Sequence, residues 1–195
     1  MMRIGVLVSG GGSNLQAIID AAQAGILKGL AEVAVVISNR PGVYALERAK
    51  KNNIPAVYMD RKQYTDSACF CASMLDEMQK YHVDMVCLAG YLSKIEPNLI
   101  AAYRGKILNI HPALLPRFGG KGMYGHHVHE AVLAGGEKES GPTVHVVDEH
   151  YDHGLIILQE KVPVLPGDTA DTLAARVLEI EHKLYPEAIK KVINT

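Results

Sequence analysis

Short apolar runs alternate with helix-like segments through the first half of the chain. The apolar runs are rich in valine and isoleucine, as strands buried on both faces are, and they cover residues 3–8, 32–37, 56–59 and 85–89. Segments with a helical pattern lie between them, at residues 15–24, 43–52 and about 66–81. The alternation predicts an α/β fold: a doubly wound, mostly parallel sheet with helices on both faces.

The pattern changes in the last third of the chain. Residues 143–147 and 155–162 are strand-like and are separated only by an acidic turn, which favours an antiparallel pair near the C-terminal part. A long helix with an apolar stripe begins at Asp168 and Thr169. We expect Pro186 to kink that helix or to begin a short final one. A single domain accommodates all 195 residues.

Composition excludes several classes of protein. A formal charge of −1 gives no general attraction to nucleic acid or to an anionic membrane. No apolar run approaches the roughly 18 residues that a membrane span needs, and no signal peptide precedes the first strand. The 3 cysteines, without a Cys-x-x-Cys, indicate reduced thiols. We therefore expect a cytoplasmic protein with small-molecule partners, as a monomer or homodimer, that binds neither nucleic acid nor membrane.

The most informative strand is the apolar segment 107–111, which stops at Pro112. Asn109 and His111 share one face of it, because successive side chains of a strand point to opposite faces. Open α/β sheets place their ligands at the C-terminal ends of their strands. An amide donor and an imidazole at that edge are therefore candidates for catalysis, and a plain loop cap is the alternative.

Three consecutive glycines lie in the segment Ser9–Asn14, between the first strand and the first helix. Glycines let backbone N–H groups approach a ligand closely, and a helix start favours anions. The segment predicts a phosphate-binding loop, with a tight turn as the alternative. It lacks the third glycine of a dinucleotide fingerprint and the Gly-Lys-Ser/Thr of a nucleoside triphosphate loop, so a phosphorylated small molecule fits better.

A glycine-rich segment at residues 117–125 precedes three histidines, His126, His127 and His129. Glycines without apolar periodicity predict a mobile flap that closes over substrates. The histidines form no i, i+4 pair, and no neighbouring cysteine or carboxylate set completes a group of ligands. We therefore expect no metal site there.

The run Asn109-Ile110-His111-Pro112, followed by Leu114-Leu115-Pro116, resembles the signature of the folate-dependent formyltransferases. The opening segment Val8–Leu15 is similar to that of the members that act on a ribosyl-phosphate glycinamide, and the resemblance extends to Glu181. It implies transfer of a formyl group from the co-substrate 10-formyltetrahydrofolate to the amine of N1-(5-phospho-D-ribosyl)glycinamide. The reaction belongs to de novo purine (IMP) biosynthesis and uses no metal.

The resemblance also implies where the substrates bind. It places a phosphate-binding half at about residues 1–105 and a folate and catalytic half at about residues 106–195. The ribonucleotide is assigned to Gly12, Ser13, Asn14 and Glu181, and a solvated helix face is the alternative for Glu181. The folate is assigned to Arg61, Leu92, Ser93, Lys94, Ile95 and Asn109. Ser93 stands where an arginine is frequent in the family.

Formyl transfer passes through a tetrahedral oxyanion, which needs hydrogen-bond donors and a group that handles protons. Asn109 supplies an amide N–H and His111 a titratable one. A carboxylate beside His111 would raise the pKa of that ring, and Asp148, Glu149 and Asp152 are all candidates by position. The resemblance chooses Asp152, so the implied catalytic set is Asn109, His111 and Asp152.

Other functions remain open. A related deformylase hydrolyses 10-formyltetrahydrofolate with the same catalytic segment, although such enzymes usually carry an extra N-terminal domain. A non-catalytic folate- or phosphate-binding module is a third possibility, and the complete set of Asn109, His111 and Asp152 argues against it. The glycine loop and the near-neutral charge disfavour transfer to methionyl-tRNA, and we expect no C-terminal domain of the kind that such a function would need.

Overall fold

A computed structural model describes all 195 residues, which divide into two compact units, Met1–Leu108 and Asn109–Thr195. The strands are β1 Met2–Val8, β2 Ala31–Ser38, β3 Ala56–Tyr58, β4 Met85–Leu88, β5 Ile107–His111, β6 Glu139–Ser140, β7 Thr143–Val146, β8 Ile156–Gln159 and β9 Val162–Pro163. The α-helices are α1 Ser13–Gln23, α2 Tyr44–Lys51, α3 Ser67–Lys80, α4 Pro97–Ala102, α5 His126–Ala134 and α6 Ala170–Ile193, and η1 Arg61–Gln63 is a short 3-10 helix. None of the helices combines the length and apolar character needed to cross a membrane.

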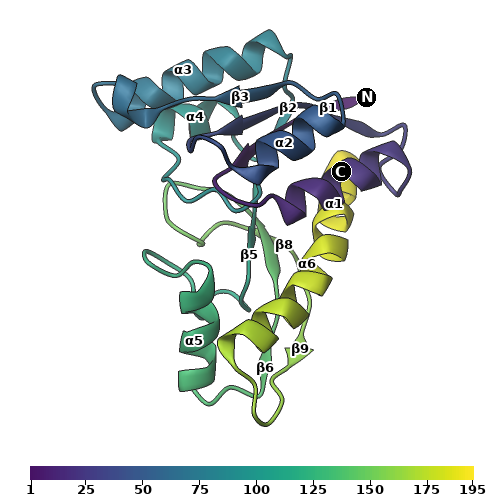
Figure 1. Ribbon diagram of the computed structural model, residues 1–195, viewed down its shortest axis with the longest axis vertical. Coiled ribbons are helices and arrows are strands. Elements are labelled where there is room, and N and C mark those ends of the chain that lie inside the picture. Colours follow the sequence, from purple (N-terminus) through teal and green to yellow (C-terminus); the bar gives the residue numbers. More distant parts are fainter. The chain divides into compact units, whose positions relative to one another are not determined.

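Seven strands form one sheet, in the order β3-β2-β1-β4-β5-β7-β8, while β6 and β9 form a second. The pairs β1–β2, β1–β4 and β2–β3 are parallel, whereas β7–β8 is antiparallel. In the first unit, α1 and α2 lie on one side of the strands and α3 and α4 on the other (Figure 1). The predicted fold class is thus confirmed. The assignment of residues 1–195 to a single formyltransferase domain stays a prediction.

The elements of the first unit follow directly from its apolar pattern. Val6, Leu7 and Val8 of β1 have no exposed surface, which is why that strand has no alternation of polar residues. The helix α3 begins where Asp66 accepts a 2.7 Å hydrogen bond from the backbone N–H of Cys69. This side-chain cap satisfies a donor that the helix itself cannot, and it sets the start of α3 at Ser67.

The structure corrects one expectation for the second unit and excludes one of the two alternatives for Pro186. The strand expected over 155–162 ends at Gln159, and Val162 pairs instead with Ser140 in the second sheet. The backbones pass so closely there that a Cβ on Gly141 would lie 1.9 Å from the carbonyl oxygen of Glu160.

The helix α6 is continuous through Pro186 from Ala170 to Ile193, so no separate final helix forms. Tyr185 and Pro186 are buried on it. Packing of that face therefore outweighs the roughly 3 kcal/mol that an internal proline costs a helix.

An apolar cluster in the second unit joins α5, α6 and β9. It contains Val132, Val162, Leu173 and Val177, all at most 4% exposed, and Phe118 packs against it. Leu173 and Val177 belong to the helical stripe that the sequence predicts as core. The cluster fixes the position of Phe118, whose carbonyl oxygen contacts a candidate catalytic residue.

Candidate active site

The catalytic candidates of the second unit begin on β5. Asn109 is half-buried, and His111 is only 3% exposed although it can carry a charge. Burying an ionisable ring without partners is costly, so its contacts matter. Nε2 of His111 lies 2.8 Å from the carbonyl oxygen of Phe118, and Nδ1 lies 3.6 Å from Oδ2 of Asp152. The carbonyl oxygen of Phe118 and the carboxylate of Asp152 can only accept hydrogen bonds. Nε2 therefore carries the proton of the neutral ring, and a second proton, added at Nδ1, would face the carboxylate.

Asn109 is oriented by a second histidine. Nδ1 of His145 lies 3.0 Å from the carbonyl oxygen of Val146, so Nδ1 donates and Nε2 is left to accept. The amide Nδ2 of Asn109 lies 3.1 Å from that Nε2 and donates to it. Its contact with Oδ1 of Asp152 is longer, at 3.5 Å, which is beyond a good hydrogen bond. One N–H of Asn109 is therefore firmly held and the other is available for a ligand.

Asp152 lies on the β7–β8 turn and has a left-handed backbone, with a φ of 55°. Aspartate tolerates this conformation better than most residues. Its Oδ2 accepts a 2.9 Å hydrogen bond from the backbone N–H of Gly120. A Cβ on the adjacent Gly119 would lie 2.6 Å from Cδ2 of Leu115 and 3.1 Å from the Cβ of Asp152, so a side chain at 119 would require the Leu115 side chain to shift. Part of the glycine-rich segment thus supports the carboxylate directly.

The pKa values of the pair partly correct the expectation. Burial lowers the pKa of His111 below 6.5, and it outweighs the opposite effects of the Asp152 charge and the Phe118 carbonyl. The net direction is opposite to the one expected from Asp152 alone. Burial raises the pKa of Asp152, but His111 and the hydrogen bond from the N–H of Gly120 act in the opposite direction, and it falls below its ordinary value. Asp152 is therefore ionised beside a largely neutral ring at neutral pH.

The structure brings Asp152, and not Asp148, to His111. Asp148 lies 3.3 Å from Nδ1 of His153 and accepts from the backbone N–H of His150. His145 and Gly120 also belong to the cluster, and the sequence argument did not include them. The only signal for His145 was its place on a strand; nothing in the sequence pointed to Gly120 in particular.

Glu181, a candidate for the ribonucleotide, lies on α6 and is 7% exposed. That burial rules out the alternative of a solvated helix face. Its role as a substrate residue stays a prediction.

The glycine loop of the first unit leads from β1 into α1. Gly12 has a φ of 73°, and a Cβ there would lie 2.7 Å from the Cβ of Ala45, so the turn itself requires this glycine. Gly10 and Gly11 have open space at that position. A cavity of about 310 Å³ lies at the loop and is lined by Gly10, Gly11, Gly12, Ser13, Asn14, Tyr44, Arg48, Ala89 and Gly90. The tight-turn interpretation thus applies to Gly12, whereas phosphate binding by the loop stays a prediction.

Arg48, which the sequence argument missed, supplies a positive charge at this cavity. Its Nε donates to the carbonyl oxygen of Gly11 at 2.9 Å, and its guanidinium lies 4.8 Å from the centre of the Tyr44 ring. Arg48 belongs to α2 but contacts the glycine loop that leads into α1, and an arginine at such a loop suits a phosphate. The feature of the sequence that could have indicated Arg48 was its i, i+4 spacing from Tyr44 on a predicted helix.

We expect Gly11→Val to weaken binding of a phosphorylated ligand by at least about tenfold while the fold is retained. The new side chain enters open space and would block close approach to the backbone. Calorimetric titration with the ribonucleotide, with the melting temperature as a check on folding, measures this. Gly12→Val is the contrasting variant and should lower the melting temperature. Unchanged affinity in a folded Gly11→Val protein would remove ligand binding from the loop.

The segment assigned to folate is tied to neighbouring strand ends. Oγ of Ser9 donates to Oδ1 of Asn39 at 2.7 Å and accepts from the backbone N–H of Leu92 at 3.0 Å. Nδ2 of Asn39 donates to Oγ of Ser93 at 2.7 Å. Asn39 thus links Ser9 to Ser93, and these hydrogen bonds join the loops after β1, β2 and β4.

The other residues assigned to folate differ in their exposure and in their contacts. Leu92 is 46% exposed and Ile95 is buried, while Lys94 lies 3.9 Å from Glu96. Arg61 lies in η1 and donates to the carbonyl oxygen of Tyr64 and to Oγ of Ser67. Their contacts with folate stay predictions.

The three histidines of α5 have different surroundings. His126 lies 3.1 Å from Asp171, and His127 lies 3.3 Å from Glu130. His129 is 4% exposed, and its Nδ1 has no hydrogen-bond partner. Burial, with smaller effects of His126 and His111, lowers the pKa of His129 to about 4.

Because His129 is buried and its pKa is lowered, we expect the free energy of unfolding to fall in acid. Above pH 6.5 His129 is neutral in both the folded and unfolded chains. As pH falls towards 4 only the unfolded chain gains the proton readily, so folding loses about 3 kcal/mol. His129→Leu should remove much of this loss, whereas His127→Leu should not. Urea unfolding between pH 7 and 4 tests this, and equal slopes for wild type and His129→Leu would contradict it.

Comparison with known proteins identifies the family. A family model described as formyl transferase matches residues 2–189. The chloroplastic phosphoribosylglycinamide formyltransferase of Vigna unguiculata is 46% identical over 188 residues, covering 96% of this chain and 60% of the relative. The phosphoribosylglycinamide formyltransferase of Haemophilus influenzae is 41% identical over 190 residues, covering 97% of this chain and 86% of the relative.

Larger proteins and solved structures also match. A trifunctional purine biosynthetic protein of Chironomus tentans is 42% identical over 98% of this chain, which spans only 14% of that relative. The crystal structure of glycinamide ribonucleotide transformylase 1 from Symbiobacterium toebii has a TM-score of 0.91 at 46% identity, covering 97% of this chain and 86% of that one. The fold, the motif on β5 and these matches agree, and the chain belongs to the formyl transferase family.

Proposed function

We propose that this chain transfers a formyl group from 10-formyltetrahydrofolate to the amine of N1-(5-phospho-D-ribosyl)glycinamide, a step of de novo purine biosynthesis. The observation that carries the proposal is the cluster of Asn109, His111, His145 and Asp152 in a member of the formyl transferase family. The names of its relatives support the choice of substrate. The partners are small molecules, and the location is the cytoplasm.

The reaction begins when the substrate amine attacks the formyl carbon. A C–N bond forms, and the carbonyl electron pair moves to oxygen to give a tetrahedral oxyanion. The free N–H of Asn109 donates to that oxygen. When the intermediate collapses, the bond from carbon to N10 breaks, and N10 takes a proton to leave as tetrahydrofolate. The attacking nitrogen loses a proton, so no co-reactant is needed.

His111 handles the proton in this scheme. The ring begins neutral because it is buried, with its open position at Nδ1 facing Asp152. That nitrogen takes up the proton that the attacking amine loses, Asp152 stabilises the imidazolium, and the ring gives the proton to N10 as the intermediate collapses. The His111 ring is thus protonated mainly in the transition state. An interaction that is made mainly in the transition state raises turnover. No metal takes part in these steps.

The substrates are assigned to residues of both units. The ribonucleotide phosphate binds at Gly11, Gly12, Ser13 and Asn14 with Arg48, and Glu181 contacts the same substrate. The folate binds along Leu92, Ser93, Lys94 and Ile95 with Arg61 and Asn109. The cavity at the glycine loop and the charge of Arg48 support the first assignment. The second rests on the family resemblance.

Amine dependence of the folate reaction tests the proposal. Purified protein is mixed with 10-formyltetrahydrofolate, and release of tetrahydrofolate is followed with and without the ribonucleotide amine. Turnover should require the amine. Equal formate release without it would replace the transferase with the alternative, a formyltetrahydrofolate deformylase.

A further inference from the structure

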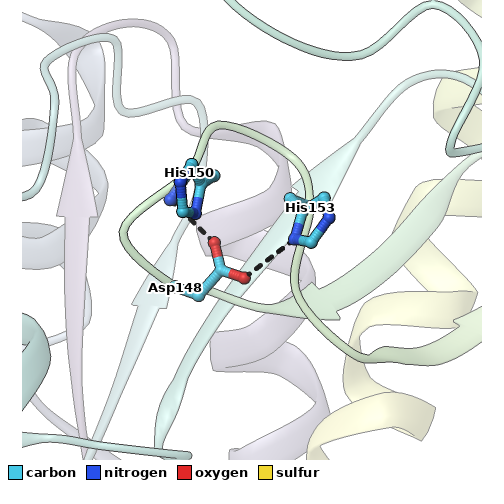
Figure 2. A group of neighbouring side chains, drawn as sticks. All are labelled: Asp148, His150 and His153. Carbon is cyan, nitrogen blue, oxygen red and sulfur yellow. Dashed lines mark hydrogen bonds and ion pairs between the residues drawn. The ribbon is translucent and has the colours of Figure 1, made fainter.

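The β7–β8 turn carries a second group of side chains, outside the catalytic cluster. Asp148, His150 and His153 point toward one another there (Figure 2), and each offers a ligand atom within 4.8 Å of the others. Oδ2 of Asp148 lies 3.3 Å from Nδ1 of His153. The rings of His150 and His153 have centroids 5.6 Å apart. Two imidazoles thus lie on either side of one carboxylate.

We propose that Asp148, His150 and His153 bind one divalent transition-metal ion of the zinc type. Two imidazole nitrogens and a carboxylate oxygen are ligands that zinc commonly takes, and Mg²⁺ or Ca²⁺ would prefer oxygen ligands throughout. Three protein ligands leave the fourth tetrahedral position to water. The histidines of α5, by contrast, have different partners and form no such group.

The distances favour this geometry. Zinc–ligand bonds near 2 Å with tetrahedral angles put neighbouring donor atoms about 3.3 Å apart. The pair Asp148–His153 already has this separation, 3.3 Å. His150 is exposed, so rotation of its side chain alone can close the remaining distance. The backbone of the turn does not have to move.

The carboxylate is also held in place. Oδ1 of Asp148 accepts a 2.8 Å hydrogen bond from the backbone N–H of His150, which leaves Oδ2 directed at His153. Such outer contacts orient metal ligands and strengthen binding. The side chain of Asp148 is 33% exposed and that of His153 is 77% exposed, so an ion and its water can enter from solvent.

A bound ion would cross-link the turn around Asp152. His150 and His153 flank Asp152 in sequence, yet the Asp152 carboxylate contacts His111, His145 and Gly120 instead of this group. The metal and the catalytic contacts therefore use different side chains of one turn. Occupancy should restrain residues 148–154, whether or not the chain transfers formyl groups.

Zinc titration of the full, tag-free chain tests the site after dialysis against a chelator. Wild type should bind one Zn²⁺ per chain by calorimetry. His150→Ala and His153→Ala should each weaken binding by more than about tenfold, the smallest cost of losing even an outer contact. His127→Ala, which removes an exposed histidine of α5, should bind like wild type. Amide hydrogen exchange at residues 148–154 should slow with zinc in wild type and in His127→Ala, but not in the two turn variants.

Two results would overturn the proposal. One is the absence of stoichiometric binding at about 100 μM zinc, well above the micromolar affinity range expected for a specific site. The other is equal binding by wild type and both turn variants, which would place the ion elsewhere. Both histidines are exposed, so the variants should fold; Asp148→Asn, which preserves side-chain size, repeats the test if either one does not.

Discussion

Replacing Asn109 with alanine should lower turnover by roughly 10²–10³-fold, the scale of losing one oxyanion donor. One N–H of Asn109 is held by His145 at 3.1 Å, and the amide nitrogen lies 3.5 Å from Oδ1 of Asp152, so its other N–H is only weakly engaged. The donor is therefore preorganised and costs little reorientation when charge develops on the formyl oxygen. Because the contact is strongest in the transition state, kcat should fall while substrate dissociation constants change little.

Steady-state kinetics and calorimetry on the same protein separate these quantities. Asn194→Ala, an exposed position at the end of α6, is the matched control and should behave like wild type. Near-normal turnover in a folded Asn109→Ala protein would make Asn109 a structural residue. A loss confined to substrate affinity would assign it to binding instead of catalysis.

Asp152→Asn should reduce turnover by roughly 10²–10⁴-fold, the usual range for general acid–base catalysis. The substitution retains size but removes the charge that raises the pKa of His111. Burial, already the stronger effect, would then be opposed only by the Phe118 carbonyl, and the His111 pKa should fall further below 6.5. The ring would resist protonation even when the oxyanion forms. Both substrates should still bind.

NMR titration of His111 in wild type and Asp152→Asn measures the cause directly. Glu149→Gln, in the same turn but exposed, is the control for loss of a carboxylate. It should leave both the His111 pKa and turnover unchanged. If Asp152→Asn likewise left both unchanged, Asp152 would not be the partner of His111.

The fold was largely predictable because the parallel strands are buried on both faces. Runs such as Val6-Leu7-Val8 have no exposed surface, and that requirement appears in the sequence as an unbroken apolar segment. Pairing between strands is harder to predict from the sequence. The change of Val162 to a second sheet depends on close backbone contact at Gly141, which no periodicity reports. The continuity of α6 through Pro186 likewise depends on tertiary burial.

The candidate site was predictable only as a list of residue types. Asn109 and His111 follow from their place at a strand end, but the orientation of Asn109 depends on His145, 36 residues away. The pKa of His111 could not be derived from its neighbour Asp152 alone, because the larger effect is burial by the whole fold. Arg48 was missed for a similar reason: its role depends on a contact with Gly11 across 37 residues.

The fate of a labelled formyl carbon tests the central claim most directly. 10-Formyltetrahydrofolate carrying ¹³C in the formyl group is mixed with the chain and the ribonucleotide amine, and products are separated by mass spectrometry. The account predicts that the label enters the formamide of the ribonucleotide, with little formate, and that Asn109→Ala slows this transfer by roughly 10²–10³-fold. Label recovered as formate at the same rate with and without the amine would contradict it.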